Sequence, residues 1–228
     1  MWPKALLLDL DNTLYEYEPA NSAAKSAVLA EISTFYGRPR DEVEAAFAAS
    51  RKRTHDALHG TASSHNRFLY LQIMFEILQI GNYQHLNRLH NLFWSEYFAH
   101  MSLRPGVLDF FETCNLPTCI VTDFTAEKQF QKLEKLKILS RFPLLVSSEE
   151  VGCEKPERAI FLAGLKKLGR ESSEVCMIGD DFKKDISGAN DCGIFAYWLT
   201  DSVVSNAAEK DYRVFHSFAD LTAILNEK

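Results

Sequence analysis

The sequence predicts an α/β protein in which a doubly wound parallel sheet, similar to a Rossmann-like core, carries an inserted all-helical domain. Two observations support this fold class. Three apolar runs of strand length each end in an acidic or hydroxyl residue, and helical patterns separate the later runs. A long stretch after the first run has helical periodicity and contains no convincing strand. We therefore expect the α/β core at residues 1–14 and 102–228 and the helical insert at residues 15–101.

The three apolar runs are the strongest strand candidates, and they are Ala5–Asp9, Thr118–Asp123 and Val175–Asp180. Runs of this length without polar alternation are typical of strands that are buried on both faces, and such strands belong to parallel sheets. Weaker strand candidates are Leu144–Val146, Ile194–Trp198 and Tyr212–Phe215.

Helical patterns lie between the later strands. One contains Gln129, Leu133 and Leu136, and another covers Ala159–Leu168. A third is expected from about Lys184 to Cys192, where the following glycine suits a left-handed helix cap. Strands that alternate with helices in this way predict the doubly wound sheet.

The insert is predicted to contain four helices. The first covers Ser22–Tyr36, and the second begins near Asp41, which we expect to act as its N-cap. The third covers Ser64–Ile80. The fourth carries one apolar stripe at spacings of three and four residues, formed by Leu86, Leu89, His90, Phe93, Trp94 and Tyr97.

The composition excludes several classes of protein. The net charge is −6, so the chain has no basic surplus with which to neutralise nucleic-acid phosphates. No apolar run is long enough to span a membrane, and the N-terminal residues do not fit a signal peptide. The five cysteines show no paired spacing for disulfides or zinc. We expect a cytoplasmic protein that binds neither nucleic acid nor membrane, and no pattern indicates an oligomeric state.

The polar residues at the strand ends carry the predicted chemistry. In a doubly wound sheet, ligands bind beyond the carboxyl ends of the strands, where Asp9, Thr122 and Asp180 would meet. Several buried carboxylates are costly unless a proton or a cation compensates them. Oxygen ligands favour magnesium among the divalent cations, so the sequence predicts a Mg²⁺ site.

Asp9 and Asp11 are two residues apart, so their side chains point the same way in an extended chain. One carboxylate can then attack phosphorus while the other transfers protons. The same Asp-x-Asp pattern also fits a turn or a fragment of a calcium-binding loop.

Further residues can complete such a site. The hydroxyl of Thr122 can donate to a phosphoryl oxygen, and Lys155 can supply a fixed positive charge. The acidic residues after the third run can bind a metal or stand beside it, or can simply cap a helix; they are Asp180, Asp181 and Asp185.

Together these segments resemble the haloacid dehalogenase superfamily of phosphotransferases, in its helical-cap branch. The resemblance covers nearly the whole chain, and the helical insert looks like the cap of that branch. Four motifs carry the resemblance: Asp9-Leu10-Asp11-Asn12-Thr13, Thr122, Glu154-Lys155-Pro156, and Gly179-Asp180-Asp181 followed by Asp185.

The resemblance implies a role for each motif. Asp9 would be the nucleophile and Asp11 the acid/base, while Thr122, Asp123 and Lys155 would hold the phosphoryl group. Mg²⁺ would be bound by Asp9, the backbone carbonyl of Asp11, and Asp180, with help from Asp185. Asp123 departs from the usual motif, which continues with a neutral residue.

The implied function is that of a Mg²⁺-dependent phosphomonoesterase that works through an aspartyl-phosphate intermediate. Its partner would be a small-molecule phosphate monoester, either a nucleoside monophosphate or a sugar phosphate, since nucleotidases and acylneuraminate-phosphate phosphatases are similar by motif. A true dehalogenase has no acid at the position of Asp11, which points to phosphate chemistry. A phosphomutase, a dehalogenase and a non-catalytic regulatory protein are the alternatives.

A polar segment of the insert is the candidate for substrate specificity. His65, Asn66 and Arg67 open a predicted helix, where anions bind well, and Arg67 offers a forked donor for carboxylate or phosphate. The alternative is that these residues cap the helix and add charge to the surface.

Overall fold

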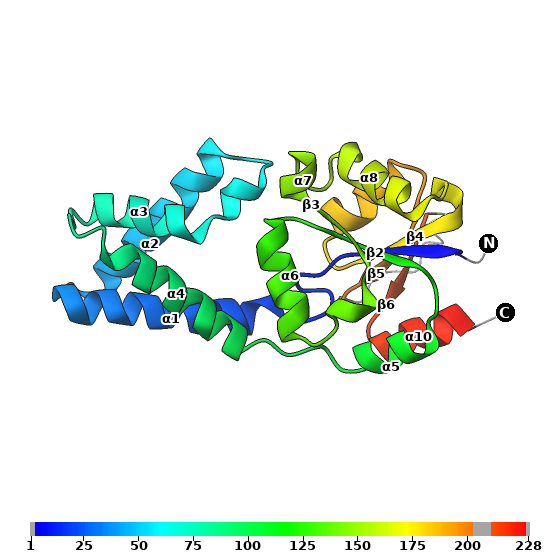
Figure 1. The fold of residues 1–228 in the computed structure, drawn as a ribbon, viewed down its shortest axis with the longest axis horizontal. Coiled ribbons are helices and arrows are strands. Elements are labelled where there is room, and N and C mark those ends of the chain that lie inside the picture. Colours follow the sequence, from blue (N-terminus) through cyan, green and yellow to red (C-terminus); the bar gives the residue numbers. More distant parts are fainter. Residues whose placement is uncertain (1–2, 203–210, 227–228) are drawn as a thin grey trace. The chain divides into compact units, whose positions relative to one another are not determined.

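A computed structural model describes residues 3–202 and 211–226 of the chain. The chain divides into two compact units, one formed by Met1–Glu16 with Ser102–Lys228 and the other by Tyr17–Met101 (Figure 1). We refer to the first as the core unit and to the second as the cap unit.

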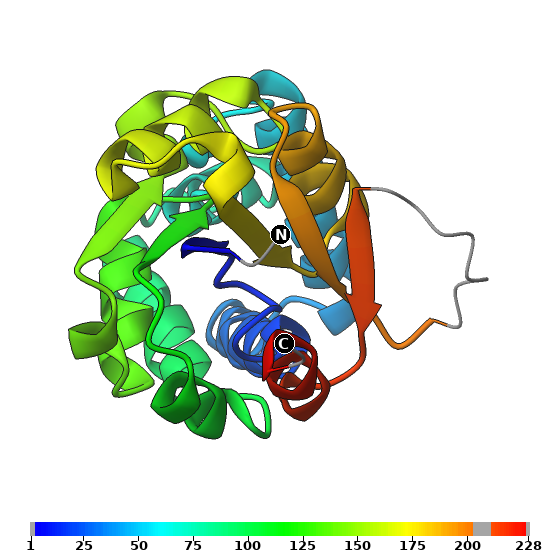
Figure 2. The same ribbon diagram turned by 90° about the vertical axis from the view of Figure 1, so that its right-hand side faces the viewer.

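The core unit is built on a parallel sheet whose six described strands run in the order β3-β2-β1-β4-β5-β6 (Figure 2). In register, Leu8 of β1 pairs with Ile120 of β2 and with Ile178 of β4, so these three strands end at the same edge. The predicted doubly wound α/β core is confirmed, including its weaker strands. The strands are β1 (Ala5–Leu8), β2 (Thr118–Thr122), β3 (Leu144–Ser147), β4 (Val175–Gly179), β5 (Phe195–Leu199) and β6 (Tyr212–Phe215).

Helices cover both faces of the sheet. Helix α8 packs on β1, β2 and β3, whereas α5 and α10 pack together on the opposite side (Figure 1). The approach of α8 is close at Gly164, where an added Cβ would lie 2.8 Å from a methyl group of Leu7. The helices of the core unit are α5 (Val107–Thr113), α6 (Ala126–Lys135), η2 (Leu139–Arg141), α7 (Ser148–Val151), α8 (Arg158–Leu168), η3 (Ser172–Glu174), η4 (Phe182–Ser187), α9 (Gly188–Asn190) and α10 (Phe218–Asn226).

The helical segment after β4 differs from the prediction. It begins at Phe182 as a single π-helical stretch, η4, and continues into the short α9, rather than starting at Lys184. The cause is Asp181, whose carboxylate accepts the backbone N–H groups of Lys183 and Lys184 at 2.9 Å each and so begins the helix earlier.

The cap unit contains α1 (Tyr17–Tyr36), α2 (Arg40–Ala57), η1 (Ala62–His65), α3 (Arg67–Ile77) and α4 (His85–Ala99). Helix α1 packs along α4, and α2 packs on α3. The predicted apolar stripe of α4 is confirmed, since Leu89, Phe93 and Tyr97 are buried. Among the described residues, no helix is both long and apolar enough to cross a membrane.

Three predicted helix starts in this unit are wrong. The first helix, α1, begins at Tyr17 and not at Ser22. Asp41 is not the N-cap of α2, because the helix already begins at Arg40 and the cap position is held by Pro39. The third predicted helix does not run from Ser64, because η1 ends at His65 and α3 begins after Asn66.

The chain leaves the core unit and returns to it through two neighbouring segments. Tyr15 and Leu103 form an antiparallel bridge, and the N–H of Arg104 donates to the carbonyl of Leu14 at 2.9 Å. The guanidinium of Arg104 also donates to the carbonyl of Asn12 at 3.1 and 3.2 Å. The outgoing and returning segments are therefore joined within the core unit itself.

Candidate active site

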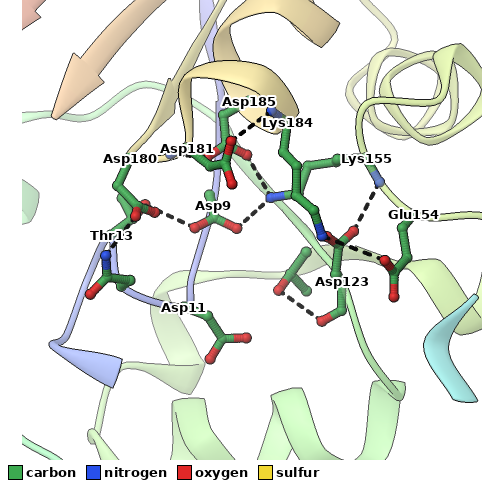
Figure 3. A network of polar contacts seen from close by, with 12 residues as sticks. Asp9, Asp11, Thr13, Asp123, Glu154, Lys155, Asp180, Asp181, Lys184 and Asp185 are labelled. Atoms are coloured by element: carbon green, nitrogen blue, oxygen red, sulfur yellow. Dashed lines mark hydrogen bonds and ion pairs between the residues drawn. The ribbon is translucent and has the colours of Figure 1, made fainter. Parts of the chain in front are cut away.

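Polar side chains from three neighbouring strands meet at the carboxyl edge of the sheet (Figure 3). Asp9 follows β1 directly, Thr122 is the last residue of β2, and Asp180 follows β4. Since these strands are adjacent and in register, the sheet brings together residues that are far apart in the sequence.

Asp9 lies at the centre of this edge and is almost fully buried, with 4% of its surface exposed. Its N–H donates to the carbonyl of Ile178 at 2.9 Å, which fixes the backbone after the strand. One carboxylate oxygen lies 2.5 Å from Nζ of Lys155, and the other accepts the hydroxyl of Thr13 at 2.8 Å. The carboxylate is therefore held in one orientation by two donors.

Lys155 supplies a buried positive charge next to Asp9. Its Nζ also lies 2.7 Å from Asp185, and the Lys155–Pro156 peptide bond is cis. Burial alone would lower the pKa of Lys155, but the charges of Asp185 and Asp9 raise it well above its ordinary value. The neighbouring carboxylates therefore stabilise the ammonium form of this side chain.

Two carboxylates contact this ammonium group, and a third lies close to them. Asp9, Asp180 and Asp185 each offer one oxygen, and these oxygens lie within 4.8 Å of one another. Burial raises the pKa of Asp9 to about 7 and the pKa values of Asp180 and Asp185 to about 6 each. Three acids against one ammonium group leave a negative excess, so this cluster could hold a metal cation.

The position of Asp180 is fixed from three sides. One oxygen accepts the amide of Asn12 at 2.6 Å, and the other lies 3.0 Å from the hydroxyl oxygen of Thr13, whose single hydrogen is shared with Asp9. The indole N–H of Trp198 donates to the backbone carbonyl of Asp180 at 2.9 Å. Thr13 therefore binds both Asp9 and Asp180, which ties the two strand ends together.

Asp185 is placed by the tight turn after β4. An added Cβ at Gly179 would lie 2.4 Å from the Asp185 carboxyl group, so only glycine leaves room for this side chain. The N–H of Asp181 donates to Asp185 at 3.0 Å. The carboxylate of Asp181 itself caps η4, so of its two proposed roles the structure displays the capping one.

Asp11 lies apart from the Asp9–Lys155–Asp185 contacts (Figure 3). One oxygen lies 2.5 Å from Nζ of Lys132 and also accepts the hydroxyl of Tyr15, while the other accepts the amide of Gln129 at 2.7 Å. Burial would raise the pKa of Asp11, but Lys132 and these hydrogen bonds lower it below its ordinary value.

The structure brings Thr122 and Asp123 beside the same cluster. Thr122 is fully buried, and its hydroxyl oxygen accepts the amide of Gln129 at 2.5 Å. The carboxylate of Asp123 accepts the N–H of Lys155 at 2.9 Å and forms an ion pair with Lys184 at 2.7 Å. Lys184 therefore offsets the negative charge that Asp123 adds where the motif usually has a neutral residue.

Five side chains of this site were not predicted, namely Tyr15, Gln129, Lys132, Lys184 and Trp198. A signal for two of them was present, because Gln129 and Lys132 fall on the same helical face as Leu133 and Leu136. A polar residue on an apolar face points to a buried polar partner. Lys184 gave no such signal.

The predicted specificity residues lie in the cap unit, and each has a partner there. The side chain of Asn66 accepts the N–H groups of Phe68 and Leu69 at 2.9 and 3.2 Å and caps α3. Arg67 donates to the carbonyl of His65 at 2.5 Å and to the hydroxyl of Tyr17 at 2.7 Å. A role in specificity stays a prediction for these residues.

Further polar groups gather around Tyr70 of α3. The guanidinium of Arg67 lies 5.5 Å from the centre of its ring, and Nε2 of His55 lies 3.0 Å from its hydroxyl. The rings of His55 and His65 are 5.0 Å apart. We call Arg67, His55, His65 and Tyr70 the cap cluster.

A buried carboxylate beside an ammonium group, with further acids at the carboxyl ends of parallel strands, defines an α/β enzyme site for an anionic substrate. Residues 3–193 match the haloacid dehalogenase-like hydrolase family model. The chain belongs to this family, and the resemblance based on its four motifs is confirmed.

Two known relatives of the chain are named as phosphatases. Ribulose-1,5-bisphosphate 5-phosphatase from Halopiger xanaduensis is 35% identical over 211 residues, which are 90% of this chain and 88% of that protein. Glyceraldehyde 3-phosphate phosphatase from Methanopyrus kandleri is 43% identical over 74 residues, 32% of each chain. The expected enzyme class is confirmed, and the chain is a phosphatase that acts on phosphoric monoesters.

A solved structure extends the likeness to the fold of the whole chain. A phosphatase of the same superfamily from Thermococcus onnurineus has a TM-score of 0.75 and is 24% identical, with 99% of each chain covered. This likeness concerns the fold alone, because the identity is low.

Proposed function

We propose that the chain is a Mg²⁺-dependent phosphatase that hydrolyses a small phosphorylated sugar through an aspartyl-phosphate intermediate on Asp9. The contact between the buried Asp9 carboxylate and Nζ of Lys155, at 2.5 Å, carries this proposal. A carboxylate that is held beside a fixed positive charge can attack an anionic phosphoryl group that the same charge attracts.

In the first step, a carboxylate oxygen of Asp9 bonds to phosphorus while the bond from phosphorus to the ester oxygen breaks. The protonated form of Asp11 donates its proton to the leaving alkoxide and becomes the carboxylate that its contact with Lys132 favours. Lys155 and Thr122 hold the phosphoryl oxygens. In the second step, Asp11 takes a proton from water as the water oxygen bonds to phosphorus. Phosphate leaves, and the Asp9 carboxylate is restored.

The acidic cluster fits a magnesium ion by the chemistry of its donors. All three candidate side chains are carboxylates, and they carry more negative charge than Lys155 can offset. When bound, Mg²⁺ would neutralise charge on the phosphoryl oxygens. Asp9, Asp180 and the backbone carbonyl of Asp11 would hold it, with Asp185 beside them.

The proposed substrate is a sugar phosphate with a second anionic group, with a nucleoside monophosphate as the second candidate. The relative that matches most of this chain is named for a sugar bisphosphate. The cap cluster contributes one guanidinium and two imidazoles, groups that suit a second phosphate or a carboxylate. We therefore propose that His65, Asn66 and Arg67 recognise the leaving group.

A phosphatase screen tests both parts of the proposal. Sugar phosphates, sugar bisphosphates, nucleotides and 2-haloacids are supplied to protein stripped of metal, and then again after Mg²⁺ or Ca²⁺ is added. We expect hydrolysis of phosphates only with Mg²⁺, and inhibition by Ca²⁺, which prefers more ligands and a looser geometry. Full activity without metal would rule out the metal role, and release of halide would favour the dehalogenase alternative.

A further inference from the structure

Two buried side chains of helix α6 bind the proposed acid/base without any assigned role. We infer that Gln129 and Lys132 are positioning residues, which orient Asp11 and, through Gln129, also Thr122. This inference rests on the proposed function, because it concerns the residues that the proposed reaction uses. It goes beyond that proposal by assigning separate tasks to the two side chains.

Gln129 bridges the proton-transfer group and the phosphate-binding group. Its amide nitrogen lies 2.7 Å from Asp11, 2.5 Å from the hydroxyl of Thr122 and 2.8 Å from the carbonyl of Asp123. A carboxylate and a carbonyl only accept hydrogen bonds, so the NH₂ end of the amide must face them. One amide group thus fixes residues from the loop after β1 and from the end of β2.

Lys132 holds the other oxygen of Asp11. Its Nζ lies 2.5 Å from that oxygen, and 4% of its side chain is exposed. The ammonium group also lies 5.5 Å from the ring of Phe124 and 6.0 Å from the ring of Tyr15. Donors from one helix therefore bind both oxygens of Asp11 and fix the orientation of its carboxylate plane.

Folding alone does not favour these residues. The Oε1 atom of Gln129 is buried and has no hydrogen-bond partner among the residues the structure describes, which destabilises the fold. An ion pair with one buried partner, such as Lys132–Asp11, is often no more stable than well-packed apolar side chains. Apolar residues at both positions would extend the face that Leu133 presents. We therefore assign the polar groups of Gln129 and Lys132 to the candidate active site and not to the stability of the fold.

The contacts predict different consequences for the two residues. The hydroxyl of Thr122 donates to the carbonyl of Asp123 at 3.4 Å, a long contact that it can exchange for a phosphoryl oxygen. The amide nitrogen of Gln129, 2.5 Å from the hydroxyl oxygen, limits where that hydroxyl lies. Loss of Gln129 should weaken both phosphate binding and proton transfer. Loss of Lys132 should impair proton transfer more than phosphate binding, because its Nζ binds Asp11, the proposed proton-transfer group.

The test combines Gln129→Leu and Lys132→Met with Asp11→Asn in two double-mutant cycles. Gln131→Leu and Lys135→Met, on the same helix, are the matched controls. Turnover is measured on an alkyl phosphate, whose leaving group needs a proton, and in the initial burst on p-nitrophenyl phosphate, whose leaving group does not. The affinity for orthovanadate with Mg²⁺ reports phosphate binding.

We expect both variants to lower kcat on the alkyl phosphate by about 100-fold, as misplacement of a catalytic group does. The aryl burst should persist in Lys132→Met. Only Gln129→Leu should weaken vanadate binding. In the Asp11→Asn background, Lys132→Met should change kcat by no more than about twofold, because its partner is already gone. If Lys132→Met lowers kcat as much in the Asp11→Asn background as it does alone, the inference is overturned.

Two further measurements separate the possible failures. If Lys132→Met does not fold, Lys132→Gln replaces it, since glutamine keeps a donor, and the Asp11→Asn/Lys132→Met pair removes both charges together. Activity retained by Asp9→Asn would overturn the proposed mechanism and this inference with it. An inactive Asp9→Asn beside fully active Gln129→Leu and Lys132→Met would overturn the inference alone.

Discussion

The candidate active site of the core unit and the start of α3 in the cap unit use polar contacts of different sequence range. In the core unit, Lys155 binds Asp9 across 146 positions of sequence, and Lys132 binds Asp11 across 121. In the cap unit, Asn66 binds the N–H groups two and three residues ahead, and Arg67 binds a carbonyl two residues back. The short-range hydrogen bonds of Asn66 and Arg67 shape the end of a helix. The long-range contacts of Lys155 and Lys132 bring together the residues of the candidate active site. The cap unit also has longer contacts, such as Arg67 to the hydroxyl of Tyr17 and Arg38 to the carbonyl of Leu78, but these join its own helices to one another.

The largest expected effect is at Asp9, the centre of the core contacts. Asp9→Asn should lower the rate of phosphate release by at least about 10³-fold, because an amide does not attack phosphorus. The fold should persist, since an amide still accepts from Thr13. Phosphate release and thermal unfolding are measured together. More than a few per cent of the original rate in a folded variant would contradict a covalent role for Asp9.

A substitution at Gly179 sharpens the comparison between the units. Gly179→Ala should destabilise the fold by about 1–3 kcal/mol and weaken Mg²⁺ binding, because the new methyl group would displace Asp185. Gly81→Ala in the cap unit is the matched control, since an added Cβ there has no atom within 4 Å. Denaturant unfolding and Mg²⁺ titration check both. Equal effects at the two glycines would mean that Asp185 is not sterically fixed.

Arg67 tests whether the cap unit carries function at all. Arg67→Ala should lower kcat/KM on the best sugar phosphate by about tenfold, the value of one lost charge-assisted contact, and leave p-nitrophenyl phosphate little affected. Lys52→Ala, an exposed cap position, is the control. If both substrates fall together, Arg67 supports the fold of the cap unit. If neither changes, its bonds to His65 and Tyr17 are purely structural.

The smallest effect concerns pH. The pKa values of Asp9, Asp180 and Asp185 are raised to about 7, 6 and 6, so the folded state binds protons more tightly than the unfolded chain does. Their contribution to stability is present below about pH 4 and is lost as the pH rises through these values. Mg²⁺ competes with these protons, so it should raise Tm by a few degrees at pH 8 and by less at pH 5.

Thermal unfolding at the two pH values, with and without Mg²⁺, measures this difference. Asp180→Asn should shrink the Mg²⁺-dependent shift at pH 8, because one of the three carboxylates is removed. An equal Mg²⁺ shift at both pH values would show that the ion binds elsewhere.

The sequence was sufficient to predict the strands and the strand-end acids, because each apolar run and its terminal residue are contiguous. Asp9, Thr122 and Asp180 could be placed together once the strands were assumed parallel and adjacent. Gln129 and Lys132 could not be placed beside Asp11, because Asp11 lies more than 100 positions earlier in the chain. The helical pattern shows only that these two side chains face inward. The start of η4 was also missed, since Asp181 fitted either a metal ligand or a helix cap.

The backbone hydrogen bond between Arg104 and Leu14 lies where the chain leaves the core unit and returns to it, so the helical insert could be deleted or exchanged at this point. The core unit closes the gap by its own bridge between Tyr15 and Leu103, so the chain could pass directly from one segment to the other through a short turn. Insertions and deletions are tolerated best where the flanking backbone is already fixed in this way. Over evolutionary time, inserts of different length and shape could be exchanged at this one point while the carboxylate cluster stays intact.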